Sequence, residues 1–353
     1  MQKLLFLFVC AVLLSCEDDT DINTIMGVAS EAPVFIAYRA ESGTEVKFQF
    51  STPVKIIQAF LDTGDDIEPF TDEYDRSISL RFTSDHSGGK AFTADLLVED
   101  ADGNSLNVLV PFKTRNDRMP KLVINEIRLN NTSGEYAEFI ELRTQTDGNL
   151  GAMRLFVAST SIDEPIYEFP LAEVAAGEYI TLHLRTLDVD KAVDELGDKL
   201  DLASAGKDGK DSNNEARDLW TPVSTKYLHE NADVIYLLDQ DDMILDGLAI
   251  TNIAKNPDAW DKNKNFSKTA ELLAKQGAWL DANGKAVKTP GVTDTVNTEN
   301  NTRTRTLCRN EAIPDSNTLA DWYICANSSA SPGAKNSTTI YAPKSTKSVA
   351  KKL

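Results

Sequence analysis

Residues 122–142, LVINEIRLNNTSGEYAEFIEL, contain two strand-like runs on either side of a turn. The first run, Leu122–Ile127, and the second, Glu138–Leu142, are rich in the branched and apolar residues that favour strands. The intervening NNTSG (130–134) consists of residues that favour turns. The stretch therefore predicts two consecutive strands at the start of a β-rich domain.

Further strand and turn motifs follow in order along the chain. They are AGEYITL at 176–182, ADVIYLLD at 232–239, MILD at 243–246, RTRTL at 303–307, DWY at 321–323 and SPGAKN at 331–336. Together with INEI and EFIEL, this ordered set over residues 121–336 resembles the lamin-tail domain, an immunoglobulin-like β-sandwich that also occurs in many exported bacterial proteins. The resemblance implies a non-catalytic interaction module and supplies no catalytic residues.

Residues 31–115 show apolar side chains at alternate positions of four runs. The runs are Val46–Phe50, Ile78–Phe82, Phe92–Val98 and Val108–Phe112. A period of two between turn signals predicts short strands with one buried face. The arrangement resembles the bacterial immunoglobulin-like modules found next to membrane anchors. We therefore expect a mainly β protein with two immunoglobulin-like β-sandwich domains in tandem, 31–115 and 121–336, joined by a polar linker at 114–120.

The N-terminus predicts export and a lipid anchor. Lys3 precedes an apolar run of 11 residues, LLFLFVCAVLL. This run is too short to span a bilayer as a helix, which takes about 20 residues, so residues 1–15 are predicted to be a signal peptide. The following LLSC resembles the bacterial lipobox, which implies that Cys16 is acylated and becomes the first residue of the mature chain. We expect this palmitate-bearing anchor to hold the protein in a bacterial membrane, and we favour the outer membrane, with the protein facing the cell surface or the periplasm.

Residues 16–30 form an acidic segment that contains Glu17, Asp18, Asp19 and Asp21. Because it has few apolar groups, we interpret it as a solvated tether, with a membrane-sorting signal as the alternative. The whole chain carries 36 Lys and Arg against 55 Asp and Glu, a formal net charge of −19. This balance argues against nucleic acid as a partner, because a negative surface is repelled by phosphate backbones.

Cys308 and Cys325 are the cysteines that remain in the mature body. An even pair in an exported protein favours a disulfide, here closing a loop of about 17 residues and worth about 3 kcal/mol in the chain-entropy model. A zinc or redox pair is the alternative, but the C-x-x-C spacing and a nearby His are missing. We therefore predict a disulfide and no metal site.

Two stretches, 186–231 and 250–300, are long insertions relative to a compact domain of the lamin-tail type. Val189, Val193 and Leu196 have helical spacing in the first insertion. Ser267–Gln276 predicts a helix in the second, with Ser267 as a possible N-cap and Leu272 and Leu273 facing inward.

The insertions also carry three tryptophans, Trp220, Trp260 and Trp279. Exposed indole rings beside polar residues suit stacking on sugar rings or anchoring a protein partner, so these three are the candidate binding residues. The alternative is that they attach the insertions to the sandwich by burial.

Catalytic motifs are sparse in this sequence. His86, His183 and His229 lie in different stretches, without zinc-protease spacing or a nucleophile elbow. Alternation in YITLHL predicts a solvated position for His183, and Glu138 and Glu141, three apart on a strand, are expected on opposite faces. A metal-dependent hydrolase would require the acidic residues to converge on one cleft.

We therefore expect a non-catalytic, lipid-anchored cell-envelope protein that binds a protein or surface partner through residues 121–336, without a cofactor. The alternative is an accessory lipoprotein that captures glycan for a hydrolase or transporter. Residues 337–353, with Lys344, Lys347, Lys351 and Lys352, are expected to be a basic disordered tail.

Overall fold

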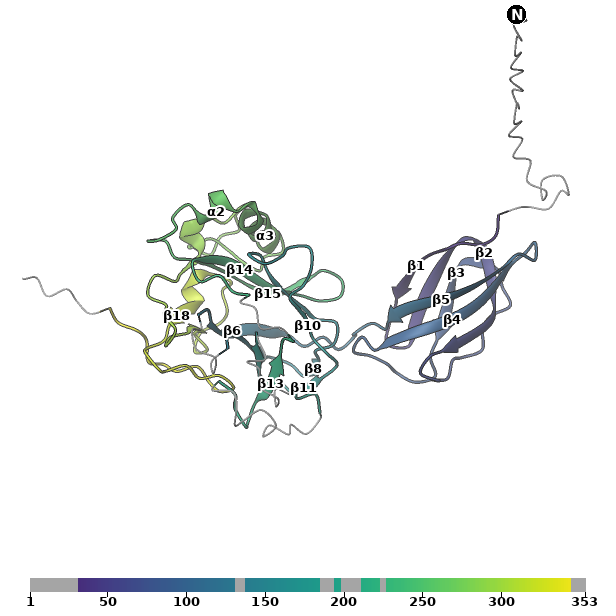
Figure 1. The fold of residues 1–353 in the computed structure, drawn as a ribbon, viewed down its shortest axis with the longest axis horizontal. Helices are drawn as coiled ribbons and strands as arrows, with labels where there is room; N and C mark the ends of the chain where they lie inside the picture. Colours follow the sequence, from purple (N-terminus) through teal and green to yellow (C-terminus); the bar gives the residue numbers. More distant parts are fainter. Residues whose placement is uncertain (1–30, 131–136, 185–193, 198–210, 223–226, 344–353) are drawn as a thin grey trace, which may run out of the picture. The chain divides into compact units, whose positions relative to one another are not determined.

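The computed structural model describes residues 31–130, 137–184, 194–197, 211–222 and 227–343 (Figure 1). The predicted signal peptide, Cys16 and the acidic tether lie outside the described residues, as does most of the helix expected around Val193. The chain divides into two compact units. The first comprises Met1–Arg39, Val46–Arg81 and Phe92–Phe112, and the second comprises Ala40–Glu45, Phe82–Ala91 and Lys113–Leu353.

Strands dominate both parts of the chain, as the periodicity predicts. The helices within the described ranges are too short or too polar to cross a membrane.

Five strands form one sheet in the N-terminal part of the described chain. They are β1 (Phe35–Ala40), β2 (Glu45–Leu61), β3 (Asp75–Arg81), β4 (Ala91–Asp100) and β5 (Ser105–Lys113). Their order is β1-β2-β4-β5, with β3 paired to β2. The 17-residue strand β2 thus serves several partners, and a register shift between Ile56 and Gln58 interrupts its pairing with β4.

The core of the first unit follows the alternation in the sequence. Side chains of β4 are buried at every second position, and Phe48 of β2 is fully buried. Phe112 stacks on Phe92 with ring centroids 5.6 Å apart and meets Phe48 edge-on at the same separation. Alternation therefore identified the buried face of these strands correctly.

The described strands of the second unit form three sheets. The first is β10 (Tyr167–Glu168), β9 (Arg154–Val157), β14 (Ala232–Leu238), β15 (Ile244–Thr251) and β16 (Val296–Asn297), in that order. The second is β13 (Arg217–Trp220), β12 (Tyr179–His183), β7 (Phe139–Thr144), β6 (Leu122–Arg128), β17 (Leu307–Arg309) and β18 (Trp322–Ile324). The third pairs β11 (Glu173–Val174) with β8 (Gly148–Asn149).

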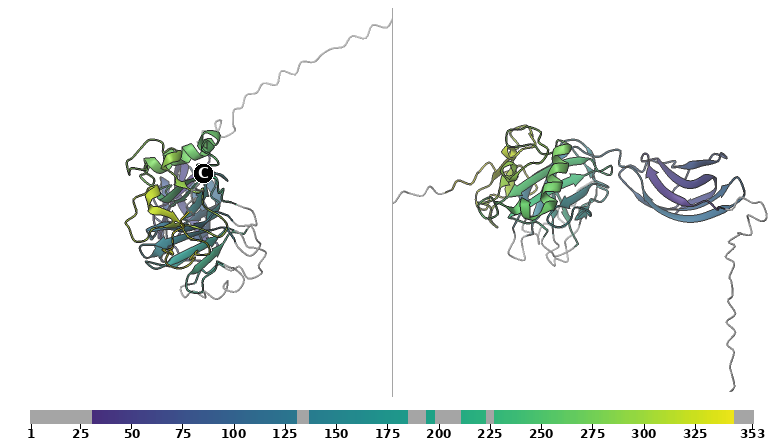
Figure 2. Two further views of the ribbon diagram at one scale, coloured as in Figure 1. Left: turned by 90° about the vertical axis from the view of Figure 1, so that its left-hand side faces the viewer. Right: turned by 90° about the horizontal axis from the view of Figure 1, so that it is seen from above.

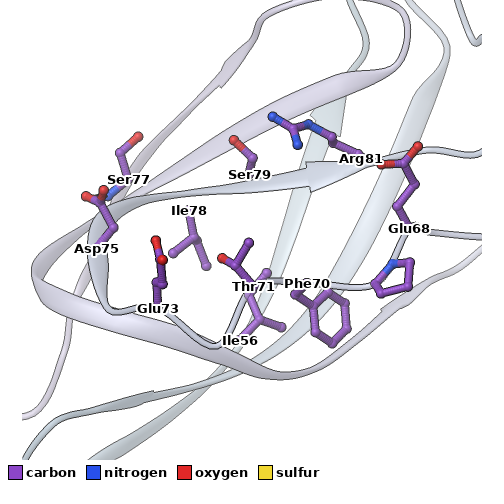
Figure 3. A pocket seen from close by; sticks show the side chains of 11 residues that line it. Ile56, Glu68, Phe70, Thr71, Glu73, Asp75, Ser77, Ile78, Ser79 and Arg81 are labelled. Atoms are coloured by element: carbon purple, nitrogen blue, oxygen red, sulfur yellow. Dashed lines mark hydrogen bonds between the residues drawn. The ribbon is translucent and has the colours of Figure 1, made fainter.

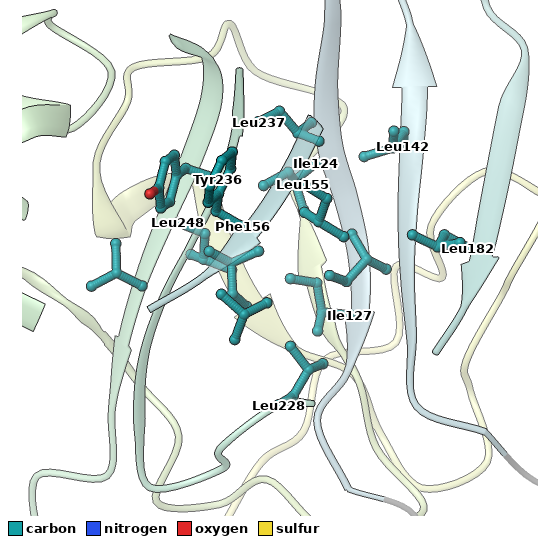
Figure 4. Close-up of a cluster of buried hydrophobic side chains, with 14 of the residues drawn as sticks. Ile124, Ile127, Leu142, Leu155, Phe156, Leu182, Leu228, Tyr236, Leu237 and Leu248 are labelled. Atoms are coloured by element: carbon teal, nitrogen blue, oxygen red, sulfur yellow. The ribbon is translucent and has the colours of Figure 1, made fainter. Parts of the chain in front are cut away.

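One apolar core is shared by the two larger sheets of this unit (Figure 4). Ile124 and Ile127 of β6 enter it from one sheet, and Leu237 and Leu248 enter it from the other. Burial of such side chains contributes roughly 1.5–3 kcal/mol each. Leu122, Ile124 and Ile127 of the run LVINEI lie in this core.

Strand β6 is buried on both faces, although Asn125, Glu126 and Arg128 are polar. A register shift between Ile124 and Glu126 in the pairing with β7 inserts one residue, Asn125, into the strand. The bulge changes which side chains share a face, so simple alternation fails here.

The insertion at 250–300 is ordered and partly helical, with α2 at Ala259–Lys262 and α3 at Lys264–Lys275 (Figure 2). Helix α3 begins earlier than predicted, because Asn263 is its N-cap and accepts a hydrogen bond from the backbone N–H of Asn265. Ser267 is therefore inside the helix. Leu273 is fully buried against Gly247 of β15, where an added Cβ would lie 2.6 Å from Leu273 Cδ2.

The tail predicted to be disordered, residues 337–353, includes residues that are paired with the sheet. Tyr341 N–H donates to the Ile324 carbonyl at 2.9 Å, and Ala326 N–H donates to the Thr339 carbonyl at 2.8 Å. Residues 339–341 therefore run beside β18, because unpaired strand edges accept further backbone segments. Residues 344–353 lie outside the described residues.

The packing of α3 predicts different effects for its adjacent leucines. Leu273→Ala should lower the free energy of unfolding of the second unit by about 2–5 kcal/mol, because it leaves a cavity in the core. Leu272 is partly buried, so Leu272→Ala is the matched control and should cost less. Denaturant unfolding of both variants measures the difference, and equal losses would contradict the orientation of α3.

Candidate functional site

The three tryptophans proposed as binding residues are buried. Trp220, Trp260 and Trp279 are 5%, 5% and 1% exposed. The indole N–H of Trp260 donates to Thr251 Oγ1 at 2.9 Å, and that of Trp279 donates to the Asp294 carbonyl at 2.9 Å. The prediction of exposed stacking rings is therefore wrong. The rings attach the insertions to the sheets, since an indole buries a large area in segments that offer few other apolar groups.

The prediction of a solvated His183 is also wrong. The side chain is 1% exposed, its Nε2 lies 2.7 Å from Asp218 Oδ1, and its ring stacks on Trp220 at 4.0 Å. Strand β13, which carries Asp218 and Trp220, comes from the first insertion and pairs in parallel with β12. The alternation of β12 could not indicate that β13 covers His183, because β13 is more than thirty residues away in the sequence.

Two glutamates face each other across β6 and β7. Glu126 and Glu141 are direct partners in the strand register, and both are fully buried. Alternation made no prediction for this pair, because it compared Glu141 only with Glu138. The bulge at Asn125 brings Glu126 level with Glu141, which the spacing of the sequence did not indicate.

These two carboxylates hold the SPGAKN segment by its backbone. Glu126 Oε2 accepts hydrogen bonds from Ser331 N–H at 3.0 Å and from Ser331 Oγ at 3.1 Å. Glu141 Oε2 accepts one from the Gly333 N–H, and its Oε1 accepts one from Asn125 Nδ2 at 2.8 Å. We call Glu126 and Glu141 the carboxylate clamp.

Glu311 and Asn336 extend the clamp. Glu311 Oε1 accepts from the Asn336 N–H at 2.8 Å, and its Oε2 accepts from the Tyr179 hydroxyl at 2.9 Å. The Asn336 amide donates to the carbonyls of Asn125 at 3.0 Å and Arg309 at 2.9 Å. The segment 331–336 is thus tied to three strands by side chains.

Burial determines the charge state of the clamp. It raises the pKa of Glu126 to about 7, opposed by hydrogen bonds from Thr306 and Ser331. It raises the pKa of Glu141 well above its usual value, and the nearby Glu126 adds to the effect. Ionisation of both carboxylates is unfavourable, because they are buried and because two negative charges would lie close together.

The structure contains no disulfide between Cys308 and Cys325, which are both buried free thiols. The two sulfur atoms and a carboxylate oxygen of Glu126 nevertheless lie within 4.8 Å of one another. Thr306 Oγ1 is 3.0 Å from Cys325 Sγ and also donates to Glu126. The hydrogen bond between the thiols and their burial raise the pKa of Cys308, whereas the same hydrogen bond lowers that of Cys325.

A second buried charge joins the two large sheets of this unit. Asp246 Oδ2 on β15 lies 2.7 Å from Arg309 Nη2 on β17 and accepts from the Ile124 N–H at 2.6 Å. Arg309 Nε donates to the Ile124 carbonyl at 2.7 Å. Burial raises the pKa of Asp246 to about 6, and the charge of Arg309 opposes the rise.

Two of the cavities that described residues line lie in the second unit. One, of about 450 Å³, is lined by Met119, Leu122, Asp246, Gln276 and Asn317 among others. The other, of about 270 Å³, lies against β18 and is lined by Trp322, Tyr323 and Tyr341 with Asn297 and Asn300. We call the second one the aromatic cavity.

The first unit has a smaller hollow between β2 and β3 (Figure 3). Its volume is about 200 Å³, and Ile56, Phe70 and Ile78 form its apolar part. The charged side chains around it are Glu68, Glu73, Asp75 and Arg81.

A protein-family model described as "protein second domain" (TP_1001_2nd) matches residues 120–324, which is more than half of the chain. The chain belongs to this family. The matched range begins just before β6 and ends with β18, so this second-domain family covers the carboxylate clamp but stops before the segment that the clamp holds.

A solved structure, that of a DUF4876 family protein from Bacteroides thetaiotaomicron, is 12% identical to the chain. The likeness covers 79% of this chain and 86% of that one, with a TM-score of 0.27. This score is too low to support a conclusion about the present chain. No curated protein matches the sequence.

The residues of the clamp belong to sequence motifs, although the apolar periodicity does not indicate them. Glu126, Glu141 and Ser331–Gly333 all belong to the motifs INEI, EFIEL and SPGAKN, and the fold of this second-domain family member brings them together. The aromatic cavity gave a weaker signal, because Tyr341 lies in a segment that its composition made look disordered.

The raised pKa of Glu126 predicts that the free energy of unfolding of the second unit depends on pH. The folded pKa of about 7 exceeds the unfolded value of 4.5. The contribution of Glu126 to the free energy of unfolding is therefore greatest below about pH 4.5 and is lost as the pH rises through 7, a change of about 3 kcal/mol. Asp233 and Asp246 shift in the same direction. Denaturant unfolding at several pH values measures the slope.

Glu126→Gln should remove this residue's share of the slope, and the same change at the exposed Glu164 should leave the slope as it is. A Glu126→Gln variant with an unchanged slope would show that Glu126 does not titrate near neutral pH.

Proposed function

We propose that this chain is a lipid-anchored protein of a bacterial cell envelope that acts by binding, with the second unit as its binding part. The observation that carries the proposal is that the buried ionisable side chains bind the backbone of the protein itself. In the described part of this unit, Glu126, Glu141 and Asp246 each bind backbone N–H groups. These groups hold loops and strands in place around the cavities.

The anchor rests on the N-terminal sequence. The apolar run at 4–14 ends at Ser15-Cys16, and an acidic segment follows directly. A cysteine at the end of such a run is the acceptor position for acyl chains, and two or more chains hold a protein stably in a membrane. The negative net charge of the chain fits this attachment, because anionic lipids would not attract the protein by themselves.

Binding is a better interpretation than catalysis because the reactive groups are tied to structure. Asp246 and Asp315 line the larger cavity of the second unit, but both are paired with Arg309. The imidazole of His183 is enclosed between Asp218 and Trp220. A catalytic acid or base must reach its substrate, and these contacts occupy the positions from which it would act.

We further propose that the second unit is a lamin-tail-like sandwich and that the first is an immunoglobulin-like module. The motifs of the resemblance support this, because INEI and EFIEL lie on adjacent antiparallel strands and the SPGAKN segment packs across both.

Glycan capture is the second candidate function. The tryptophans that first suggested it are buried, but Trp322, Tyr323 and Tyr341 line an open cavity. Aromatic faces beside amide side chains are suited to sugars.

Export also predicts that Cys308 and Cys325 become oxidised. Their sulfurs are close and free, and exported proteins meet an oxidising environment. In the exported chain, denatured without reduction, we expect neither cysteine to react with an alkylating reagent and the mass to be two hydrogens lower. Two alkylated cysteines in that sample would refute the disulfide, and prior reduction is the control that exposes both thiols.

The lipid anchor is tested by phase separation in detergent. We expect the native chain to enter the detergent phase and to incorporate a labelled fatty acid, because acyl chains on Cys16 carry it there. Cys16→Ser should abolish the labelling. Cys10→Ser is the matched control, since Cys10 is predicted to leave with the signal peptide.

Labelling that survives Cys16→Ser would refute the anchor. Protease treatment of intact and lysed cells then distinguishes the two faces of the envelope. Digestion on intact cells indicates the outer surface, and protection until lysis indicates the periplasm.

A further inference from the structure

The aromatic cavity is formed by segments that lie far apart in the sequence. Trp322 and Tyr323 belong to β18, Asn297 ends β16, and Tyr341 comes from the segment beside β18. Val296 and Leu319 supply an apolar part. The cavity exists only after residues 339–341 have paired with the edge of the sheet.

Its walls are fixed by hydrogen bonds and by one cation–π contact. The guanidinium of Arg305 lies 3.6 Å from the centre of the Tyr341 ring. The same group donates to the Asn300 carbonyl at 2.6 Å and to Asn327 Oδ1 at 2.7 Å. Arg305 therefore joins the Tyr341 wall to the Asn300 wall, and the aromatic faces are held in position before any ligand arrives.

The residues that line the cavity are uncharged, and they offer two kinds of contact. Trp322, Tyr323 and Tyr341 offer aromatic rings, and Asn297 and Asn300 offer amides that both donate and accept. The guanidinium of Arg305 lies behind the lining and is already bonded to the Asn300 carbonyl and to Asn327. A charged ligand would therefore lose its hydration here without a charged lining residue to replace it. The composition thus favours a neutral ligand with apolar faces and several hydroxyl groups.

A buried donor in the cavity wall also lacks a partner. The Trp322 side chain is 8% exposed, and its indole Nε1 has no hydrogen-bond acceptor among the described residues. An unsatisfied buried N–H costs about 1–3 kcal/mol. Because Nε1 is itself shielded from solvent, Trp322 contributes ring surface to the cavity wall and not a donor for a ligand.

We infer that the aromatic cavity binds one ring of a neutral pyranose sugar, stacked on the face of Tyr341 that Arg305 leaves open and hydrogen-bonded through Asn297 and Asn300. The inference rests on glycan capture, the second candidate function above. The volume of about 270 Å³ lies just below the range of about 300–1,000 Å³ typical of sites for larger organic ligands. It therefore suits a single ring of a longer chain that runs on over the surface.

The experiment titrates the full exported chain, in detergent, with glucose, galactose, mannose and N-acetylglucosamine, and with glucuronic acid and glucosamine as charged analogues. Saturation-transfer NMR and indole fluorescence report binding. We expect saturable binding of at least one neutral sugar in the millimolar range, as befits one ring, and weaker binding of the charged analogues.

Two substitutions assign the binding to the cavity. Tyr341→Ala should weaken binding about tenfold, and Asn300→Ala, which removes an amide of the wall but keeps the carbonyl that Arg305 binds, should weaken it about threefold to tenfold. Tyr74→Ala is the matched control, because Tyr74 also lies beneath a cation, with Lys55 Nζ 5.2 Å from its ring centre. Tyr74→Ala should bind sugar like the unsubstituted chain.

The inference is overturned if none of the neutral sugars binds saturably, if a charged analogue binds more tightly than all of them, or if Tyr341→Ala binds as well as the Tyr74→Ala control. Saturable sugar binding that survives Tyr341→Ala would overturn this inference and leave glycan capture standing. A chain that enters the detergent phase but binds none of the sugars would overturn both and leave the anchor standing. An unsubstituted chain that binds sugar but incorporates no labelled fatty acid would overturn the anchor alone.

Discussion

The second unit depends on two carboxylates that lie opposite each other inside it. Glu126 and Glu141 are cross-strand partners on β6 and β7, and their oxygens bind the backbone of Ser331 and Gly333. Removing a carboxylate from water is costly unless hydrogen bonds replace the lost hydration. Ser331 and Gly333 of a distant segment donate those hydrogen bonds to the clamp, so the segment and the strands stabilise each other.

The position of the C-terminal segment follows from the clamp. Once Ser331 and Gly333 are held, Asn336 binds the carbonyls of Asn125 and Arg309, and the chain can continue beside β18. Tyr341 then forms a wall of the aromatic cavity. A buried structural interaction and an open surface feature are thus consecutive parts of one segment, and disturbing the first would displace the second.

The insertions serve structure more than recognition in the described residues. Trp260 and Trp279 fill space between the 250–300 insertion and the sheet, while Trp220 covers His183 at the edge of β12. Large aromatic residues in long insertions suggested an exposed binding face, but the same area that favours stacking on a ligand also favours burial. The aromatic residues that line an open cavity come instead from β18 and from the segment beside it.

Local patterns in the sequence determined the strands and their buried faces in the first unit, because a period of two depends only on neighbouring residues, as Phe92–Val98 illustrates. They also determined the order of motifs that builds β6 and β7. The bulge at Asn125, the cover over His183 and the pairing of Glu126 with Glu141 were decided by tertiary structure. Each of these depends on contacts between segments remote in the chain, and burial of a polar side chain is favourable only when its distant partner is in place.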